Sequence, residues 1–383
     1  PGSAIGFDPS HIALRDIRMG IDSVMYYGRD MNAVIREFSM YERSGLSVTS
    51  LTGRLFADST VIRIPSLKLL TPHSEMNLTA QTYWELINIP TTGRLTARFN
   101  ARIGKQDVLL FAGGLPEAFK EAYPFRPLVI HAGTEGNLKQ MQISRFTAEL
   151  PGAFSLNGGG EFWNLTDSVK RNGNMDFEMH TQNLNFLTGL ADIAPDGSII
   201  VPDSMHLAAR VGMEGTQCTA ALKLLEKEGV LNLDAAYNLA TEAYHADLAI
   251  NNLQVHHFLP KDSIYTLTAK MSAKGQGVDV ASRKTVAALN ASLEKLQYGH
   301  WDISGVEAHA GLKSSVATVR LASDNVLLKM QGNADMRLDR SYLDGALDLN
   351  VEEVNLHKLG LVPRPLKHPF AFTMGAEARH DSL

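Results

Sequence analysis

Alternation of apolar and polar side chains constrains this chain more than any other feature. The stretch STVIRIPSLKLLTPHSEMNLTAQ, residues 59–81, alternates, breaks at Pro65 and Pro72, and then alternates again. A period of two residues is typical of β-strands that have one dry face and one wet face. The pattern returns through most of the 383 residues, so the sequence predicts a mainly β fold.

Glycine, asparagine, aspartate or proline separates most of the alternating segments, which indicates antiparallel hairpins. In GRLTARFNARIG, residues 93–104, Leu95 and Phe99 share one face, whereas Arg94 and Arg98 share the other. We expect an elongated, curled, antiparallel-rich sheet of β-taco or groove-like form, with a few short helices. The expected strands lie within residues 23–28, 32–41, 45–58, 60–70, 75–86, 93–104, 206–215, 218–226, 229–239, 244–255, 263–277, 300–313, 315–323, 325–339 and 345–354.

Helix signals are few. Residues 115–125 have Pro116 near the start and Pro124 at the end, and they place Ala118, Phe119 and Ala122 on one side. Residues 183–195 form a second candidate, and residues 283–299 form a third, for which the Thr, Val and Asn content leaves a strand as the alternative. These segments are too short to cover so many strands.

Composition narrows the possible functions. The chain is 44% hydrophobic and 20% charged, with a net charge of −5 and a pI near 6.2, so it is a folded protein without the basic surface that binds nucleic acid. Cys218 is the only cysteine, which excludes a disulfide framework. The sequence has no run of about 18 apolar residues, so it predicts no membrane-spanning helix.

Catalytic and metal-binding motifs are absent from the sequence. No G-x-S-x-G, H-E-x-x-H or P-loop pattern occurs, so we expect no enzymatic activity and no cofactor. His256 and His257 are adjacent on an expected strand end and should point to opposite faces, so we expect no metal site there. The run 158–160 of three glycines predicts a bulge or wide turn, and Glu226 reads as a solvated strand-end charge.

Weak internal similarity organises the chain. The segments that begin at Phe177, Leu248 and Leu347 align without gaps, and each predicts a strand that turns into a short hydrophobic stub. We predict an N-terminal β-section over residues 1–112, a helical segment over 113–127, a second β-section over 128–200 and a C-terminal β-section over 201–383. The chain ends in what reads as a strand, so we expect it to be a section of a longer protein whose anchor lies elsewhere.

The order of these segments and their amino-acid sequences resemble the AsmA/TamB-like family of Gram-negative envelope proteins, especially the TamB branch of Bacteroidetes. The resemblance covers about three quarters of the chain. It is carried by LSVTSLTG from Leu46, IRIPSLKL from Ile62, TPHS from Thr71, ADLAINNLQVHHFLP, YTLTAKMSAKGQGVDV and the segment from Leu296 to Met336. The repeats of the C-terminal section are accordingly AsmA-like.

The resemblance implies a periplasmic location, an inner-membrane anchor outside this chain, and a role in lipid transport or outer-membrane assembly. It also implies an outer-membrane β-barrel partner of the BamA or TamA type, contacted through parts outside this chain. Phospholipid or another lipid is the expected cargo, because a continuous apolar lining removes most of the cost of exposing acyl chains to water.

Two arrangements remain open from the sequence, an open groove and a sealed core, and so do two functions. One is a lipid conduit, and the other is a structural scaffold or chaperone that pairs with client β-strands. The residues that we expect to line the groove are Ile62, Ile64, Leu67, Leu69, Leu95, Phe99, Leu207, Val211, Leu248, Ile250, Leu267, Met271, Leu347 and Leu349.

Overall fold

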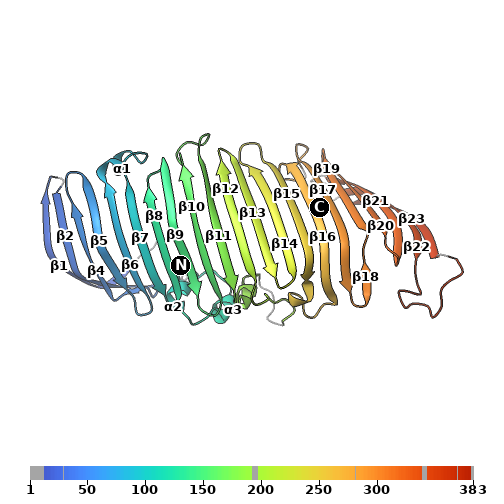
Figure 1. The fold of residues 1–383 in the computed structure, drawn as a ribbon, viewed down its shortest axis with the longest axis horizontal. Helices are drawn as coiled ribbons and strands as arrows, with labels where there is room; N and C mark the ends of the chain where they lie inside the picture. The colour runs from blue at the N-terminus through green and yellow to red at the C-terminus, as the bar shows by residue number, and fades with distance from the viewer. Residues whose placement is uncertain are drawn as a thin grey trace. The chain divides into compact units, whose positions relative to one another are not determined.

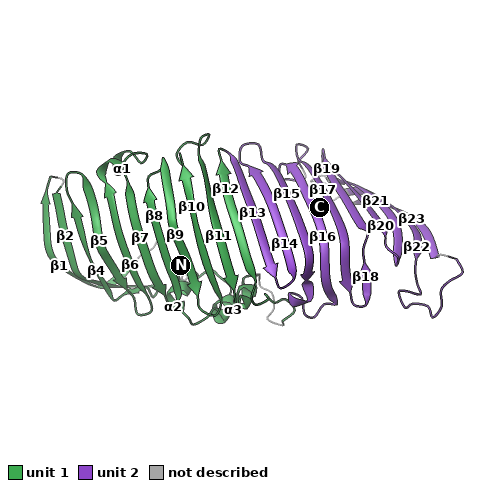
Figure 2. Cartoon of the chain, viewed as in Figure 1, with its two compact units in different colours: residues 1–215 green, residues 216–383 purple. Residues whose placement is uncertain are grey.

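The computed structural model confirms a mainly β fold, with 63% of residues in strands and 8% in helices. The strands are antiparallel and the sheet is not closed. The chain divides into two compact units, residues 1–215 and 216–383 (Figure 2). The structure describes residues 13–28, 30–191, 197–280, 282–338, 343–368 and 370–380.

Unit 1 holds twelve strands that follow one another along the chain (Figure 1). Strand β1 pairs with β2, β2 pairs with β3 and β4, and from β4 to β12 each strand pairs with the next. The strands are β1 (Leu14–Tyr27), β2 (Asp30–Glu42), β3 (Ser47–Val48), β4 (Ser50–Ala57), β5 (Val61–Leu70), β6 (Glu75–Tyr83), β7 (Leu95–Ile103), β8 (Leu128–Gly136), β9 (Gln140–Leu150), β10 (Phe154–Trp163), β11 (Asn172–Thr181) and β12 (His206–Glu214).

Unit 2 repeats this plan with its own strands. Each strand from β13 to β17 pairs with the next, β17 pairs with β18 and β19, and the succession continues from β19 to β23. The strands are β13 (Gln217–Glu226), β14 (Gly229–Asn238), β15 (Ala243–Gln254), β16 (Ile264–Gln276), β17 (Val286–Tyr298), β18 (Trp301–Ile303), β19 (Val306–Lys313), β20 (Val316–Asp324), β21 (Leu328–Leu338), β22 (Leu343–Val354) and β23 (Phe370–His380).

The helices are short and belong mostly to unit 1. They are α1 (Trp84–Asn88), α2 (Lys105–Phe111), α3 (Glu117–Ala122), and the 3-10 helices η1 (Asn185–Ala191) and η2 (Val255–His257). Helix α3 confirms the prediction for residues 115–125. The second helix candidate forms η1, while its last residues, 192–195, lie outside the described part. The ambiguous segment 283–299 is strand β17.

A small cluster of buried residues lies at one end of the strands of unit 1. Phe119 and Tyr123 of the α3 segment pack on Phe186 of η1, with ring centroids 5.7 and 5.5 Å apart. Leu150, Ala153 and Leu184 complete this cluster. The cluster covers only the strand ends, so most of the sheet is not packed against it.

Helix α2 is fastened to the turn between β5 and β6, a contact that the sequence patterns did not reveal. Asp107, in the first turn of α2, is buried and accepts hydrogen bonds from the hydroxyls of Thr71 and Ser74. The Ser74 hydroxyl also accepts a hydrogen bond from the backbone N–H of Gly104, at 3.0 Å. Alternation cannot indicate such a contact, because it joins residues more than thirty positions apart.

Two local predictions have clear outcomes. Pro65 does not break β5, because a register shift between Ile64 and Leu67 absorbs the proline as an irregularity within one strand. The three glycines 158–160 lie in β10, where the register against β9 shifts between Gly158 and Gly160, as expected for a bulge.

The section boundaries predicted at residues 112, 127 and 200 stay predictions, since the structure shows only a division after Gly215. The expected strand-to-stub turns occur at all three aligned segments. Strand β11 is followed by η1, β15 by η2, and β22 by a turn over residues 356–360.

Candidate functional site

One face of the unit 2 sheet is apolar along its whole width. The strand register places ten residues in a single row, each directly opposite the next on the neighbouring strand. The row reads Leu222, Leu233, Leu248, Met271, Ala291, Ala308, Leu321, Gly332, Leu349 and Met374. Directly paired side chains share a face, so this row is one continuous apolar strip.

Neighbouring rows on the same face repeat the composition. One row runs from Leu224 through Ile250 to Phe372, and another runs from Ala220 through Ala246 to Ala376. These three rows of ten residues contain no charged side chain, although 20% of the whole chain is charged. We call this surface the apolar face of unit 2.

The apolar face of unit 2 is not sealed against water in the described part of the chain. Met271 is 39% exposed, Leu347 is 37% exposed and Met374 is 45% exposed. The three rows hold ten alanines and one glycine beside larger residues, so small and large side chains are mixed on this face. Contiguous exposed apolar surface is typical of sites that bind proteins, ligands or membranes.

Unit 1 has an apolar face of its own. A single row crosses eleven strands, from β1 to β12 with only the two-residue β3 left out. The row reads Ile21, Ile35, Gly53, Leu67, Leu78, Phe99, Ala132, Phe146, Gly158, Phe177 and Ala209. We call this surface the apolar face of unit 1.

The opposite face of each unit is polar. In unit 1 the row Lys68, Asn77, Asn100, His131, Thr147, Asn157, Glu178 and Ala208 illustrates it. In unit 2 a hollow of about 440 Å³ lies over Asp234, Asp247, Lys270 and His309 on this polar face. Leu248, Met271 and Ala291 of the apolar row also line this hollow.

All fourteen residues predicted to line a groove lie on these apolar faces. Eight belong to unit 1 and six to unit 2. None of them is buried, and Val211 is the most exposed, at 48%. They thus share the apolar faces, with Val211, Met271 and Leu347 exposed and the others half-buried, whereas their role as the lining of a lipid groove stays a prediction.

Two interpretations of individual residues are wrong. Glu226 is not a solvated strand-end charge, because its side chain is 1% exposed and accepts a hydrogen bond from His257 Nδ1 at 2.8 Å. His256 and His257 do not point to opposite faces, since η2 replaces the expected strand end and brings their ring centroids to 4.2 Å. The second error arises because a helical turn changes side-chain directions from those of a strand, and the first because the partner of Glu226 lies 31 residues away along the chain.

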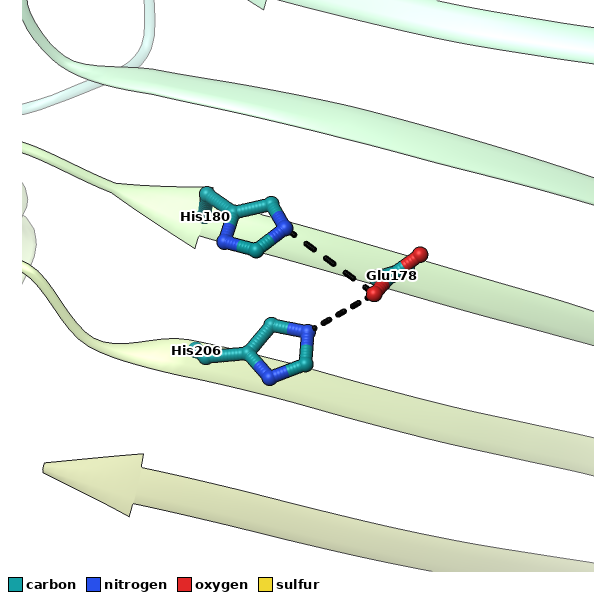
Figure 3. A group of neighbouring side chains, drawn as sticks. All are labelled: Glu178, His180 and His206. Atoms are coloured by element: carbon teal, nitrogen blue, oxygen red, sulfur yellow. Dashed lines mark hydrogen bonds and ion pairs between the residues drawn. The ribbon is translucent and has the colours of Figure 1, made fainter.

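A cluster of three metal-binding side chains on the polar face of unit 1 was missed from the sequence. Glu178 and His180 lie two residues apart on β11, and His206 stands directly opposite His180 on β12 (Figure 3). His206 Nε2 is 3.0 Å from Glu178 Oε1, and His180 Nε2 is 3.9 Å from the same oxygen. Sequence spacing alone could not find a group that depends on strand pairing.

Charge on this polar face is balanced locally. Asp176 pairs with Arg210 one row further along the same two strands, with 2.5 Å between Oδ1 and Nε. The hydrogen bond to Asp176 raises the pKa of the Arg210 guanidinium. Arg210 is therefore engaged with Asp176 and not with the glutamate of the cluster.

The fold and its surfaces define an antiparallel β protein whose two units each carry one apolar and one polar face. Comparison of the chain with protein-family models, with curated proteins and with solved structures gives no match. No helix among the described residues is long and apolar enough to cross a membrane. The apolar faces are the strongest candidate site, so the function is argued from them.

Proposed function

We propose that this chain is a non-enzymatic section of a periplasmic bridge whose apolar faces carry phospholipid acyl chains between the inner and outer membranes. The observation that supports the proposal most strongly is the charge-free row from Leu222 to Met374, which crosses ten strands, is half-buried for most of its length and is exposed at Met271 and Met374. The full-length protein is anchored in the inner membrane and contacts an outer-membrane β-barrel through parts outside this chain. These last two points rest on the resemblance to the AsmA/TamB-like family.

The energetics favour acyl chains as the occupant. Each buried CH₂ group contributes about 0.8 kcal/mol, so two chains of about 16 carbons cost on the order of 20 kcal/mol to expose to water. A surface of leucine, methionine and alanine removes much of that cost without fixing the lipid in place, because dispersion contacts have no preferred direction. Mobility of this kind is what a conduit requires.

The width of the face suits a path rather than a single binding pocket. Strands in a sheet lie about 4.8 Å apart, so a row across ten strands extends for about 43 Å. Every position along the row is apolar, and a lipid that moves along it meets no charged side chain. An ordinary sealed core would bury these residues, whereas Met271, Leu347 and Met374 are exposed.

The test is to purify the full chain gently and to identify co-purifying lipids by native mass spectrometry and extraction. The variant Ile250→Asp places a charge on the apolar face of unit 2. The matched control is Ala249→Asp, one residue earlier on β15, whose position faces the polar side opposite Lys270. We expect phospholipid on the wild type and on Ala249→Asp, and several-fold less on Ile250→Asp.

The fold is measured in parallel by circular dichroism. An unchanged spectrum for Ile250→Asp together with lost lipid supports an open lipid-carrying face. Global unfolding of this variant would indicate a sealed core. A wild-type protein that carries no lipid and accepts none from vesicles would refute the conduit and favour a scaffold that pairs with client strands.

A further inference from the structure

We infer that Glu178, His180 and His206 form a binding site for a divalent transition metal of the zinc type on the polar face of unit 1. Each residue offers one ligand atom, and these atoms all lie within 4.8 Å of one another. Two imidazoles and one carboxylate are a common ligand set for Zn²⁺ with an open position for water. The inference is independent of the lipid proposal, because the cluster lies on the opposite face of the sheet.

The strand register brings the ligands together. Residues 178 and 180 share a face because they are two apart on β11, and His180 pairs directly with His206 on β12. The two imidazole rings are stacked, with centroids 4.4 Å apart and planes inclined by 12°. A tetrahedral zinc ion with bonds of about 2.0–2.1 Å holds its ligand atoms about 3.3 Å apart. The ligand atoms, which lie within 4.8 Å of one another, therefore have to close by at most about 1.5 Å to reach this geometry.

The backbone beside the two histidines is fixed by a pair of hydrogen bonds. The N–H of Thr181 donates to the carbonyl of Met205, and the Thr181 hydroxyl accepts from the N–H of Met205, both at 2.9 Å. Thr181 and Met205 are themselves buried. Each residue directly neighbours one of the histidines, so the spacing of the two imidazoles is set before any ion arrives.

The surroundings of the cluster are compatible with a cation. Arg210, the cationic residue in the next row of the same strand pair, is held by Asp176 through two hydrogen bonds. Glu178 supplies a negative charge at the centre of the group and contacts both histidines. Imidazole nitrogen favours zinc, nickel and copper over magnesium or calcium, which sets the class of metal.

The experiment titrates the full chain with Zn²⁺ and, separately, with Mg²⁺ in a calorimeter. We expect one equivalent of Zn²⁺ to bind more tightly than the remaining histidines bind it, and no comparable binding of Mg²⁺. The variants His206→Ala and Glu178→Gln should each weaken this first equivalent about 10-fold or more. Thermal melting gives a second readout, in which Zn²⁺ raises the melting temperature of the wild type but not of His206→Ala.

The matched control is His131→Ala. His131 also lies on the polar face of unit 1, where its Nδ1 is 2.6 Å from Oδ1 of Asn100 on the neighbouring strand. Its removal should leave zinc binding unchanged. Circular dichroism checks the fold of every variant, and His180→Asn replaces His206→Ala if the latter does not fold. Absence of a tight first equivalent, or equal zinc binding by the wild type and the folded cluster variants, would overturn the inference.

Discussion

The Nδ1 nitrogen of His257 lies 2.8 Å from Oε1 of Glu226, and the carboxylate of Glu226 is almost completely buried. Glu226 ends β13, whereas His257 lies in η2 after β15, so the contact joins two strand ends of unit 2. The other carboxylate oxygen, Oε2, has no hydrogen-bond partner among the described residues. The imidazole of His257 is therefore the main hydrogen-bond donor to the buried carboxylate of Glu226.

The substitution His257→Ala should lower the free energy of unfolding by about 2–4 kcal/mol, because it leaves a buried carboxylate without its donor. Urea unfolding followed by circular dichroism measures the loss. The control is His245→Ala, an exposed histidine on β15, which should change stability by less than about 0.5 kcal/mol. Equal stability of the two variants would show that the contact contributes nothing.

Tyr123 makes the aromatic cluster of unit 1 sensitive to alkali. Burial raises the pKa of Tyr123 above its ordinary value of 10, because the neutral phenol is favoured among the rings of Phe119 and Phe186. The stabilising effect is complete below pH 10 and is lost as the pH rises through the folded-state pKa. Tyr123→Phe should flatten the decline of unfolding free energy above pH 10, whereas Tyr27→Phe, at an exposed position, should leave it unchanged.

Gly160 shows how closely strands β10 and β11 approach one another. A β-carbon at this position would lie 2.2 Å from the carbonyl oxygen of Asn174. Gly160→Ala should therefore destabilise the protein by about 1–3 kcal/mol, as measured by thermal or urea unfolding. At Gly332 the nearest atom, Leu349 Cδ1, would be 3.5 Å away, so Gly332→Ala should be tolerated. Comparable losses for both variants would contradict this explanation.

Cys218 provides a native probe of the apolar face of unit 2. It lies opposite Tyr237, which in turn lies opposite Tyr244 on the same face. As the only cysteine, it can be labelled without mutation. If phospholipid occupies this face, delipidated protein should react with a small thiol reagent several-fold faster than lipid-loaded protein. Identical labelling rates would place the lipid elsewhere.

The alternation in the sequence is enough to predict the fold class and which residues share a face of a strand, whereas the lining role of those residues stays a prediction. Leu248 and Met271 share a face because a two-residue period fixes side-chain direction once the strands are known. A register shift of one residue in β15, for example, would bring the charged Asp247 onto the apolar side. Antiparallel pairing of chain neighbours then set the register with little ambiguity.

The features that were missed depend on distant contacts or on short helical turns. The cluster of Glu178 and His206 joins residues 28 positions apart, and only the pairing of β11 with β12 brings them together. Helix α2, which carries Asp107 in its first turn, was missed because seven residues give too little periodicity to separate a helix from a strand. The sequence predicts an exposed Glu226 because the partner of this residue, His257, lies 31 positions further along the chain.

Within each unit, strands pair almost only with their neighbours in sequence, so such a chain can change its number of strands by gain or loss of hairpins. Gaining or losing a whole hairpin leaves strand direction and the two-sided pattern intact on both sides of the change. Gaining or losing one strand reverses the direction of everything that follows. The width of such a sheet can thus change in steps of two strands, about 10 Å at a time, while the remaining hairpins keep their pairing.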